Sequence, residues 1–69
     1  MQNDLHSERI QVERKQFFFD LRENERGCFL RITEDVGGRR DAIVVPASGL
    51  RDFQATLGRV IERVERTSD

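Results

Sequence analysis

The segment that decides the fold is residues 16–22, which read QFFFDLR. From Phe17 onward its odd positions are all apolar, whereas its even positions combine one aromatic ring with charged groups. The odd set is Phe17, Phe19 and Leu21, and the even set is Phe18, Asp20 and Arg22. An extended chain sends alternate side chains to opposite faces, so this segment predicts a β-strand with one apolar face and one aromatic and charged face.

Three further strands are expected around this segment, over residues 8–13, 28–33 and 40–45. Residues 24–27 (NERG) and 35–38 (DVGG) carry the Asn, Asp and Gly typical of tight turns. The inward positions change from even in the first strand to odd in the second, which predicts a tight reversal within residues 13–16. Short connections of this kind make neighbouring strands antiparallel.

The hydrophobic period changes after Pro46 from two residues to the spacing of a helix. Six apolar residues then recur along one side: Leu50, Phe53, Leu57, Val60, Ile61 and Val64. Ser48 is a suitable N-cap, and Asp52 brings negative charge to the first turns, so a helix from about Ser48 to Arg66 is expected. Four antiparallel strands followed by one helix define an α+β fold, ββββα, whose helix covers one sheet face and leaves the other to water or a ligand.

Length and composition limit the class of protein. The 69 residues suffice for one domain, and 36% hydrophobic residues with 36% charged residues and a net charge of −1 fit neither a disordered tail nor a strongly basic protein. Because a short chain buries few apolar side chains, their burial offsets the loss of conformational entropy on folding only marginally. We therefore expect a second copy of the chain to complete the core. We expect residues 1–7 to be a flexible N-terminus, residues 8–66 the folded unit and residues 67–69 a polar tail.

The expected cellular location of the chain rests on its lack of a membrane span, a signal peptide and paired cysteines. No apolar run reaches the roughly 20 residues of a membrane span, and residues 1–10 have no signal-peptide core. Cys28 is the single cysteine and alternates inward with Leu30, so an inert core thiol is expected rather than a disulfide. We therefore expect a reduced, cytoplasmic protein without membrane contact.

The uncovered face of the sheet is the candidate binding site. Phe18 and Phe29 are expected on it beside Arg22 and Arg31, with Arg14 and Lys15 at the near strand end. Aromatic rings interleaved with basic groups are typical of single-stranded nucleic-acid binding, in which bases stack on rings and cations meet phosphates. Eleven of the twelve basic residues are Arg, which favours planar stacking and bidentate phosphate contact.

Two other interpretations of this face stay open. Outward phenylalanines also occur where a partner copy covers them, because exposed apolar patches mark interfaces of many kinds. Arg22 and Arg31 could instead pair with Asp20 and Glu34 to form a solvated face.

Catalysis is not expected. The only histidine, His6, lies in the polar N-terminal stretch, the carboxylates are scattered, and no metal-ligand spacing is present. Residues 37–40 (GGRR) lack the pattern of a phosphate-binding loop and predict a hairpin turn, with Arg39 and Arg40 as candidates for phosphate contact. The sequence therefore predicts no enzyme, cofactor, metal or small-molecule substrate.

Two stretches, residues 15–24 (KQFFFDLREN) and 26–32 (RGCFLRI), resemble the PUR repeat of the Pur-alpha family. That repeat carries an aromatic-rich YFLD(V/L)K-x-N strand, a turn and then RGRFL(K/R)(I/V). The likeness continues through residues 37–40, 43–47 and 50–53, so it covers roughly residues 8–65, and the length is similar to that of single-repeat bacterial members. The resemblance implies the ββββα repeat, two copies intertwined as a homodimer through exchanged C-terminal helices, and binding of single-stranded, often purine-rich, DNA or RNA.

The same resemblance implies roles for individual residues. Lys15 matches a basic residue that contacts nucleic acid, Phe18 an aromatic residue that stacks on a base, and Arg31 a basic residue of the third strand. Glu13 stands where the family often has Gln or Asn, and a carboxylate there repels phosphate. Cys28 replaces the Arg of the GRF motif and removes one charge. These departures keep a second function open, a protein-interaction or regulatory dimer with little affinity for nucleic acid.

Overall fold

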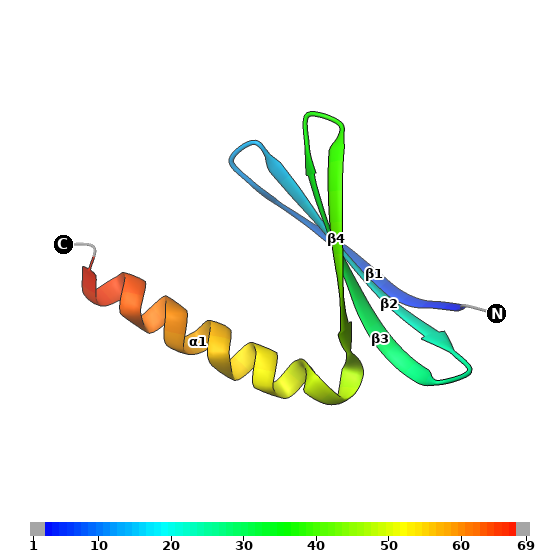
Figure 1. The fold of residues 1–69 in the computed structure, drawn as a ribbon. Helices are drawn as coiled ribbons and strands as arrows, with labels where there is room; N and C mark the ends of the chain where they lie inside the picture. The colour runs from blue at the N-terminus through cyan, green and yellow to red at the C-terminus, as the bar shows by residue number, and fades with distance from the viewer. Residues whose placement is uncertain (1–2, 68–69) are drawn as a thin grey trace.

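The computed structural model describes residues 3–67, which form four strands and one long helix (Figure 1). The strands are β1 (Asn3–Val12), β2 (Lys15–Asn24), β3 (Gly27–Val36) and β4 (Arg39–Pro46). A short 3-10 helix, η1 (Ala47–Gly49), leads into α1 (Leu50–Thr67). The predicted ββββα order is confirmed.

The four strands form one antiparallel sheet in the order β1-β2-β3-β4, and two residues connect each strand to the next. The predicted reversal within residues 13–16 is confirmed: Glu13 has a φ of 57°, in the left-handed region that non-glycine residues rarely adopt. At the last turn Gly37 and Gly38 have φ values of 59° and 89°. The Gly38 amide donates to the Asp35 carboxylate at 3.1 Å, which ties this turn to the end of β3.

The strand register separates two faces of the sheet, as the alternation of residues 16–22 predicts. Phe19 lies opposite Glu8 and Ile32, whereas Phe18 lies opposite Arg9 and Thr33. We call the first side the apolar face; its hydrophobic members are Ile10, Val12, Phe17, Phe19, Leu21, Cys28, Leu30, Ile32, Val36, Ile43 and Val45. We call the second side the polar face; it carries Ser7, Arg9, Phe18, Asp20, Arg22, Phe29, Arg31, Thr33 and Arg40.

The strands β2, β3 and β4 extend beyond the expected residues 16–22, 28–33 and 40–45, and the starts of β1 and α1 differ as well. β1 begins at Asn3 rather than near residue 8, because β2 extends to Asn24 and offers backbone partners to the earlier residues, with an irregularity between Asp4 and His6. α1 begins at Leu50 rather than Ser48. The residues directly after the extended Pro46 form η1, so Ser48 lies in this 3-10 turn and does not cap the long helix.

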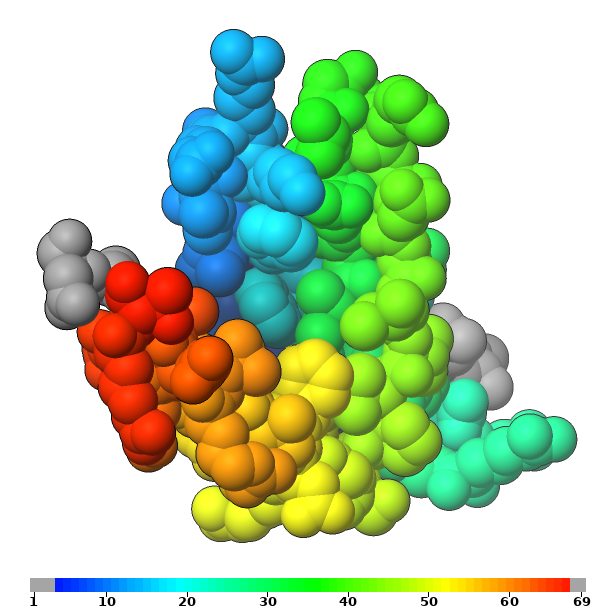
Figure 2. Space-filling model, turned by 60° about the vertical axis from the view of Figure 1, so that its left-hand side comes forward, coloured from blue at the N-terminus to red at the C-terminus, as the bar shows by residue number. Residues whose placement is uncertain are grey.

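The course of α1 is the main departure from expectation. The helix leaves the end of β4 and runs away from the sheet (Figure 1), and Figure 2 shows the two upper hairpins standing clear of it. The radius of gyration is 14.2 Å, compared with about 11 Å for a compact chain of this length. The expectation that the helix covers a sheet face is wrong for the single chain, because the connection is only the three residues of η1 and the helix does not fold back.

The single chain has no closed hydrophobic core over the part that the structure describes. Thr33, at 8% exposure, is the one buried side chain there, and no apolar side chain is buried. The large apolar residues of α1 from Phe53 onward are 42–57% exposed, including Leu57 and Val64. Burial of apolar area is the dominant favourable term in folding, so this arrangement leaves that term incomplete.

Within residues 3–67, no helix combines the length and the apolar character that crossing a membrane requires. Cys28 is exposed at the start of β3, with its Sγ 3.9 Å from a Glu23 carboxylate oxygen. The expectation of a core thiol is therefore wrong for the single chain, because the strand end lies beyond any covering element.

Candidate nucleic-acid interface

The polar face is a grid of side chains set by the strand register. From the first turn to the far end of the sheet, successive rows across the strands begin with Gln11, Arg9, Ser7 and Asp4 on β1. The corresponding residues on β2 are Gln16, Phe18, Asp20 and Arg22, and those on β3 are Asp35, Thr33, Arg31 and Phe29. Each of β2 and β3 therefore carries one aromatic ring among charged and polar groups on this face.

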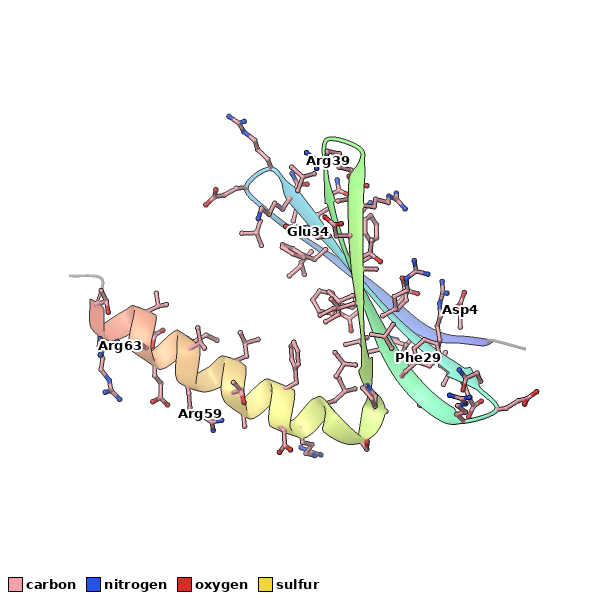
Figure 3. The ribbon with its side chains drawn as sticks, viewed as in Figure 1. Asp4, Phe29, Glu34, Arg39, Arg59 and Arg63 are labelled. Carbon is pink, nitrogen blue, oxygen red and sulfur yellow. The ribbon has the colours of Figure 1, made fainter. Side chains whose placement is uncertain are left out.

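Two phenylalanines stand on this face, as the sequence predicts. Phe18 on β2 and Phe29 on β3 are both half-buried, and one row of the grid, that of Asp20 and Arg31, lies between them. Figure 3 shows Phe29 and Asp4 on the side of the sheet away from α1. Phe29 lies opposite Arg22, so each ring has a basic neighbour. The structure thus brings Phe18, Phe29, Arg22 and Arg31 onto one face, and their role in binding stays a prediction.

The arginines of the polar face have different partners. Arg22, with its side chain 26% exposed, pairs with Asp4, with 3.0 Å between Nε and a carboxylate oxygen. Asp20 accepts a hydrogen bond of 2.8 Å from the Ser7 hydroxyl. Arg31 is exposed and makes no ion pair with the other described residues. Its guanidinium is therefore available to a ligand.

The open pairing of Arg22 and Arg31 with Asp20 and Glu34 is not what the structure contains. Glu34 lies opposite Phe17 on the apolar face and pairs there with Lys15 at 2.9 Å. The polar face is left with four arginines and three aspartates, a net charge of +1 on a chain whose total is −1 (Arg9, Arg22, Arg31 and Arg40; Asp4, Asp20 and Asp35). The excess positive charge is small, but it lies on the polar face, where nucleic acid is expected to bind.

A recess of about 340 Å³ lies in the polar face. Its walls include the Phe18 ring, the guanidinium-bearing Arg31 and Arg40, the Asp20 carboxylate and the buried Thr33. The lining is half polar in character, unlike the hollows on the apolar face, where Phe19, Leu30 and Leu50 dominate. A concave site with an aromatic wall and converging polar groups can hold a flat polar molecule such as a nucleobase.

The residues of the first turn are positioned differently from Phe18. Glu13 and Arg14 form the β1–β2 turn, and Lys15 begins β2 on the apolar side beside Val12 and Phe17. The Glu13 carbonyl accepts a hydrogen bond from the Gln11 amide at 3.2 Å. Contact of Lys15, Arg14 and Glu13 with nucleic acid stays a prediction, and the structure does not bring Lys15 onto the same face as Phe18.

Two arginines of the polar face were missed or given another role by reasoning from the sequence. Arg9 lies directly opposite Phe18; counting outward from a turn centred on residues 13 and 14 pairs the two. Arg40, expected only as a phosphate contact beside the last turn, lies over the Phe18 ring, 5.4 Å from its centroid. That contact joins β4 to β2 across β3, and no local sequence pattern indicates it.

Among residues 3–67, no three His, Cys, Asp or Glu side chains are grouped as metal ligands would be. The polar face offers aromatic rings, hydrogen-bonding groups and charged side chains to a ligand.

An open antiparallel sheet whose free face combines aromatic rings with arginines is typical of modules that bind single-stranded nucleic acid. The family model described as PurA ssDNA and RNA-binding protein matches residues 1–69, and the chain belongs to this family. The resemblance to PUR repeats is thereby confirmed.

Curated relatives show the same kinship. Transcription factor Pur-alpha 1 of Arabidopsis thaliana is 47% identical over 53 residues, which cover 77% of this chain and 18% of the relative. Transcriptional activator plp-1 of Caenorhabditis elegans is 40% identical over 62 residues, 87% of this chain and 27% of the relative. Transcriptional activator protein Pur-alpha of Homo sapiens is 35% identical over 65 residues, 84% and 20% respectively. The chain spans only about a fifth to a quarter of the length of these relatives.

Proposed function

We propose that this chain binds single-stranded DNA or RNA through its polar face, and does so as a homodimer. The observation that carries the proposal is the polar face itself, where Phe18 and Phe29 lie among four arginines while α1 lies toward the apolar side. The family match supports the ligand class, because its description names ssDNA and RNA.

The binding chemistry follows from what an unpaired strand exposes. Its bases present flat π-faces that stack on aromatic rings, a contact worth about 1–3 kcal/mol per base. Its phosphates attract guanidinium groups, for which the exposed Arg31 is placed best. In a duplex the base faces are already stacked, so the proposal favours single strands over duplex. Purines offer the larger stacking surface, which makes purine-rich strands the expected preference.

The homodimer completes the hydrophobic core that the single chain lacks. The apolar face of the sheet and the apolar side of α1 are both exposed, and a hollow of about 470 Å³ separates Phe19, Ile32 and Leu57. A second copy supplies both missing surfaces at once: each helix crosses to the partner's sheet and the partner's helix returns. Figure 3 shows Arg59 and Arg63 on the side of α1 turned away from the sheet, so the polar side of the helix stays in water.

The experiment is a titration of a fluorescent purine-rich single strand with the Phe18→Ala variant. Losing one base stack of about 1–3 kcal/mol predicts a Kd raised by about 5- to 150-fold. Val44→Ala is the matched control, because it shortens another apolar side chain of the same face, one that is 59% exposed. An unchanged mass by light scattering and an unchanged thermal midpoint show that assembly and fold are intact in each variant. Equal binding by the wild type and Phe18→Ala would remove the stacking role.

A second function is favoured by the modest charge of the polar face. On this face Arg22 pairs with Asp4 and Arg40 with Asp35, so part of the positive charge is neutralised within the chain. A dimer of this kind could act on a protein partner with little affinity for nucleic acid, and neither function requires catalysis. Filter binding at low salt separates the two, because retention of single strands no better than background would favour the protein partner.

A further inference from the structure

The Phe18 ring is not bare in the free chain. The Arg40 guanidinium carbon lies 5.4 Å from the centroid of the ring, within the range of a cation–π contact. Arg40 belongs to β4 and Phe18 to β2, so the side chain reaches across β3. Thr33, which lies between Phe18 and Ala42 in the register, is 8% exposed, and this small side chain leaves room for the crossing.

A second contact holds the guanidinium in this position. Arg40 Nε lies 2.8 Å from a carboxylate oxygen of Asp35, whose side chain is only 18% exposed. The same carboxylate accepts the Gly38 amide at 3.1 Å through its other oxygen. The turn therefore holds Asp35, and Asp35 holds the Arg40 guanidinium beside the Phe18 ring before any ligand arrives.

A base that approaches this side of Phe18 meets Arg40 first. Displacing Arg40 would separate a charge-assisted hydrogen bond and leave the largely buried Asp35 without its cation, which is costly. Stacking on the guanidinium instead requires no rearrangement, because the Arg40 side chain is 64% exposed. Guanidinium planes are established stacking surfaces for unpaired bases.

We propose that Arg40 is a base-stacking residue: its guanidinium, held by Asp35, lies on the Phe18 ring and presents the outer surface on which a nucleobase stacks. We call this pair the Phe18–Arg40 stack. The inference rests on the proposed binding of single strands and adds to it the residue that meets the base. It differs from a phosphate contact, which the position of Arg40 beside a glycine turn suggests from sequence alone.

Lysine distinguishes the two roles, because it keeps the charge of arginine but lacks the plane. The test compares Arg40→Lys with the wild type on a fluorescent oligonucleotide of alternating dG and dA and on an abasic strand of equal length. The matched control is Arg39→Lys, one residue earlier, where alternation points the side chain to the other face. The thermal midpoint of each variant confirms the fold, and an exposed Arg-to-Lys change leaves it in place.

The expected result is that Arg40→Lys binds the purine strand about tenfold more weakly, within the range of a single base stack. On the abasic strand Arg40→Lys and the wild type bind equally, and Arg39→Lys matches the wild type on both strands. Retained purine binding by Arg40→Lys would overturn the inference, and so would an equal loss on the abasic strand, which would mark a backbone contact. If Phe18→Ala weakens binding while Arg40→Lys does not, the inference fails and the proposed function stands. If the wild type does not bind single strands at low salt, both the inference about Arg40 and the proposed function fail.

Discussion

Replacing Leu57 by glutamate should separate the two copies of the proposed homodimer. Leu57 lies in the middle of the apolar side of α1 and is 51% exposed in the single chain. Full burial of a leucine contributes about 1.5–3 kcal/mol, so burying its exposed half under the partner contributes about 0.8–1.5 kcal/mol. Each dimer contains the residue twice, which doubles the loss to about 1.5–3 kcal/mol.

The introduced carboxylate adds a second penalty. A charged group buried without a partner costs at least about 1–3 kcal/mol, again counted twice. The two effects together amount to roughly 4–9 kcal/mol, or a dimer dissociation constant raised by at least about a thousandfold. This loss should convert a stable dimer into a chain that is monomeric or unfolded at the same concentration.

The assay is mass by sedimentation or light scattering over a dilution series, with circular dichroism followed on heating. Arg63→Glu is the control, because it introduces the same carboxylate on the side of α1 that is turned away from the sheet (Figure 3). This control should keep both the dimeric mass and the thermal midpoint. A Leu57→Glu chain that stays dimeric with an unchanged midpoint would refute the reasoning, as would a wild type that is monomeric throughout the series.

Three further outcomes follow from the turns and the polar face. Glu13→Gly should raise stability by about 0.5–1 kcal/mol, seen as a higher thermal midpoint, because the strain relieved at a φ of 57° exceeds the extra backbone entropy that glycine loses on folding; a lower midpoint would contradict this. Gly38→Ala should lower stability by about the same amount, since its φ is 89°, and an unchanged midpoint would show that the turn relaxes. Arg31→Gln should reduce the slope of log K against log salt for a single strand by about 0.7, the share of one phosphate contact. An unchanged slope would mean that Arg31 does not meet the backbone.

Much of the sheet could be predicted because its determinants are local. The odd and even positions of residues 16–22 settle which side chains share a face, since alternation is a property of the extended backbone itself. Asn24 marks one turn, where its side-chain oxygen accepts the Arg26 amide at 2.8 Å, and the Gly37–Gly38 pair marks another by its positive φ angles. The turn between β1 and β2 has no such residue. The sequence predicts it only because the inward-facing positions change from even to odd around Glu13.

Local sequence patterns predict only part of the candidate site. Phe18, Phe29, Arg22 and Arg31 follow from alternation, and the register places them together. The contact of Arg40 with Phe18 depends on three strands at once and on a small residue, Thr33, between them. The position of Lys15 also could not be predicted from the sequence, because its ion pair with Glu34 is a cross-strand contact on the apolar face.

The sequence by itself determined the four strands, their turns, the two chemically different faces and an amphipathic helix, because periodicity and turn chemistry act over a few neighbouring residues. Only the tertiary structure decided that α1 leaves its own sheet uncovered, because the three residues of η1 set the direction of a helix of 18 residues and no hydrophobic pattern encodes that direction. The tertiary structure likewise decided that a guanidinium covers the ring expected to meet the base, because residues 18 and 40 become neighbours only once β3 lies between their strands.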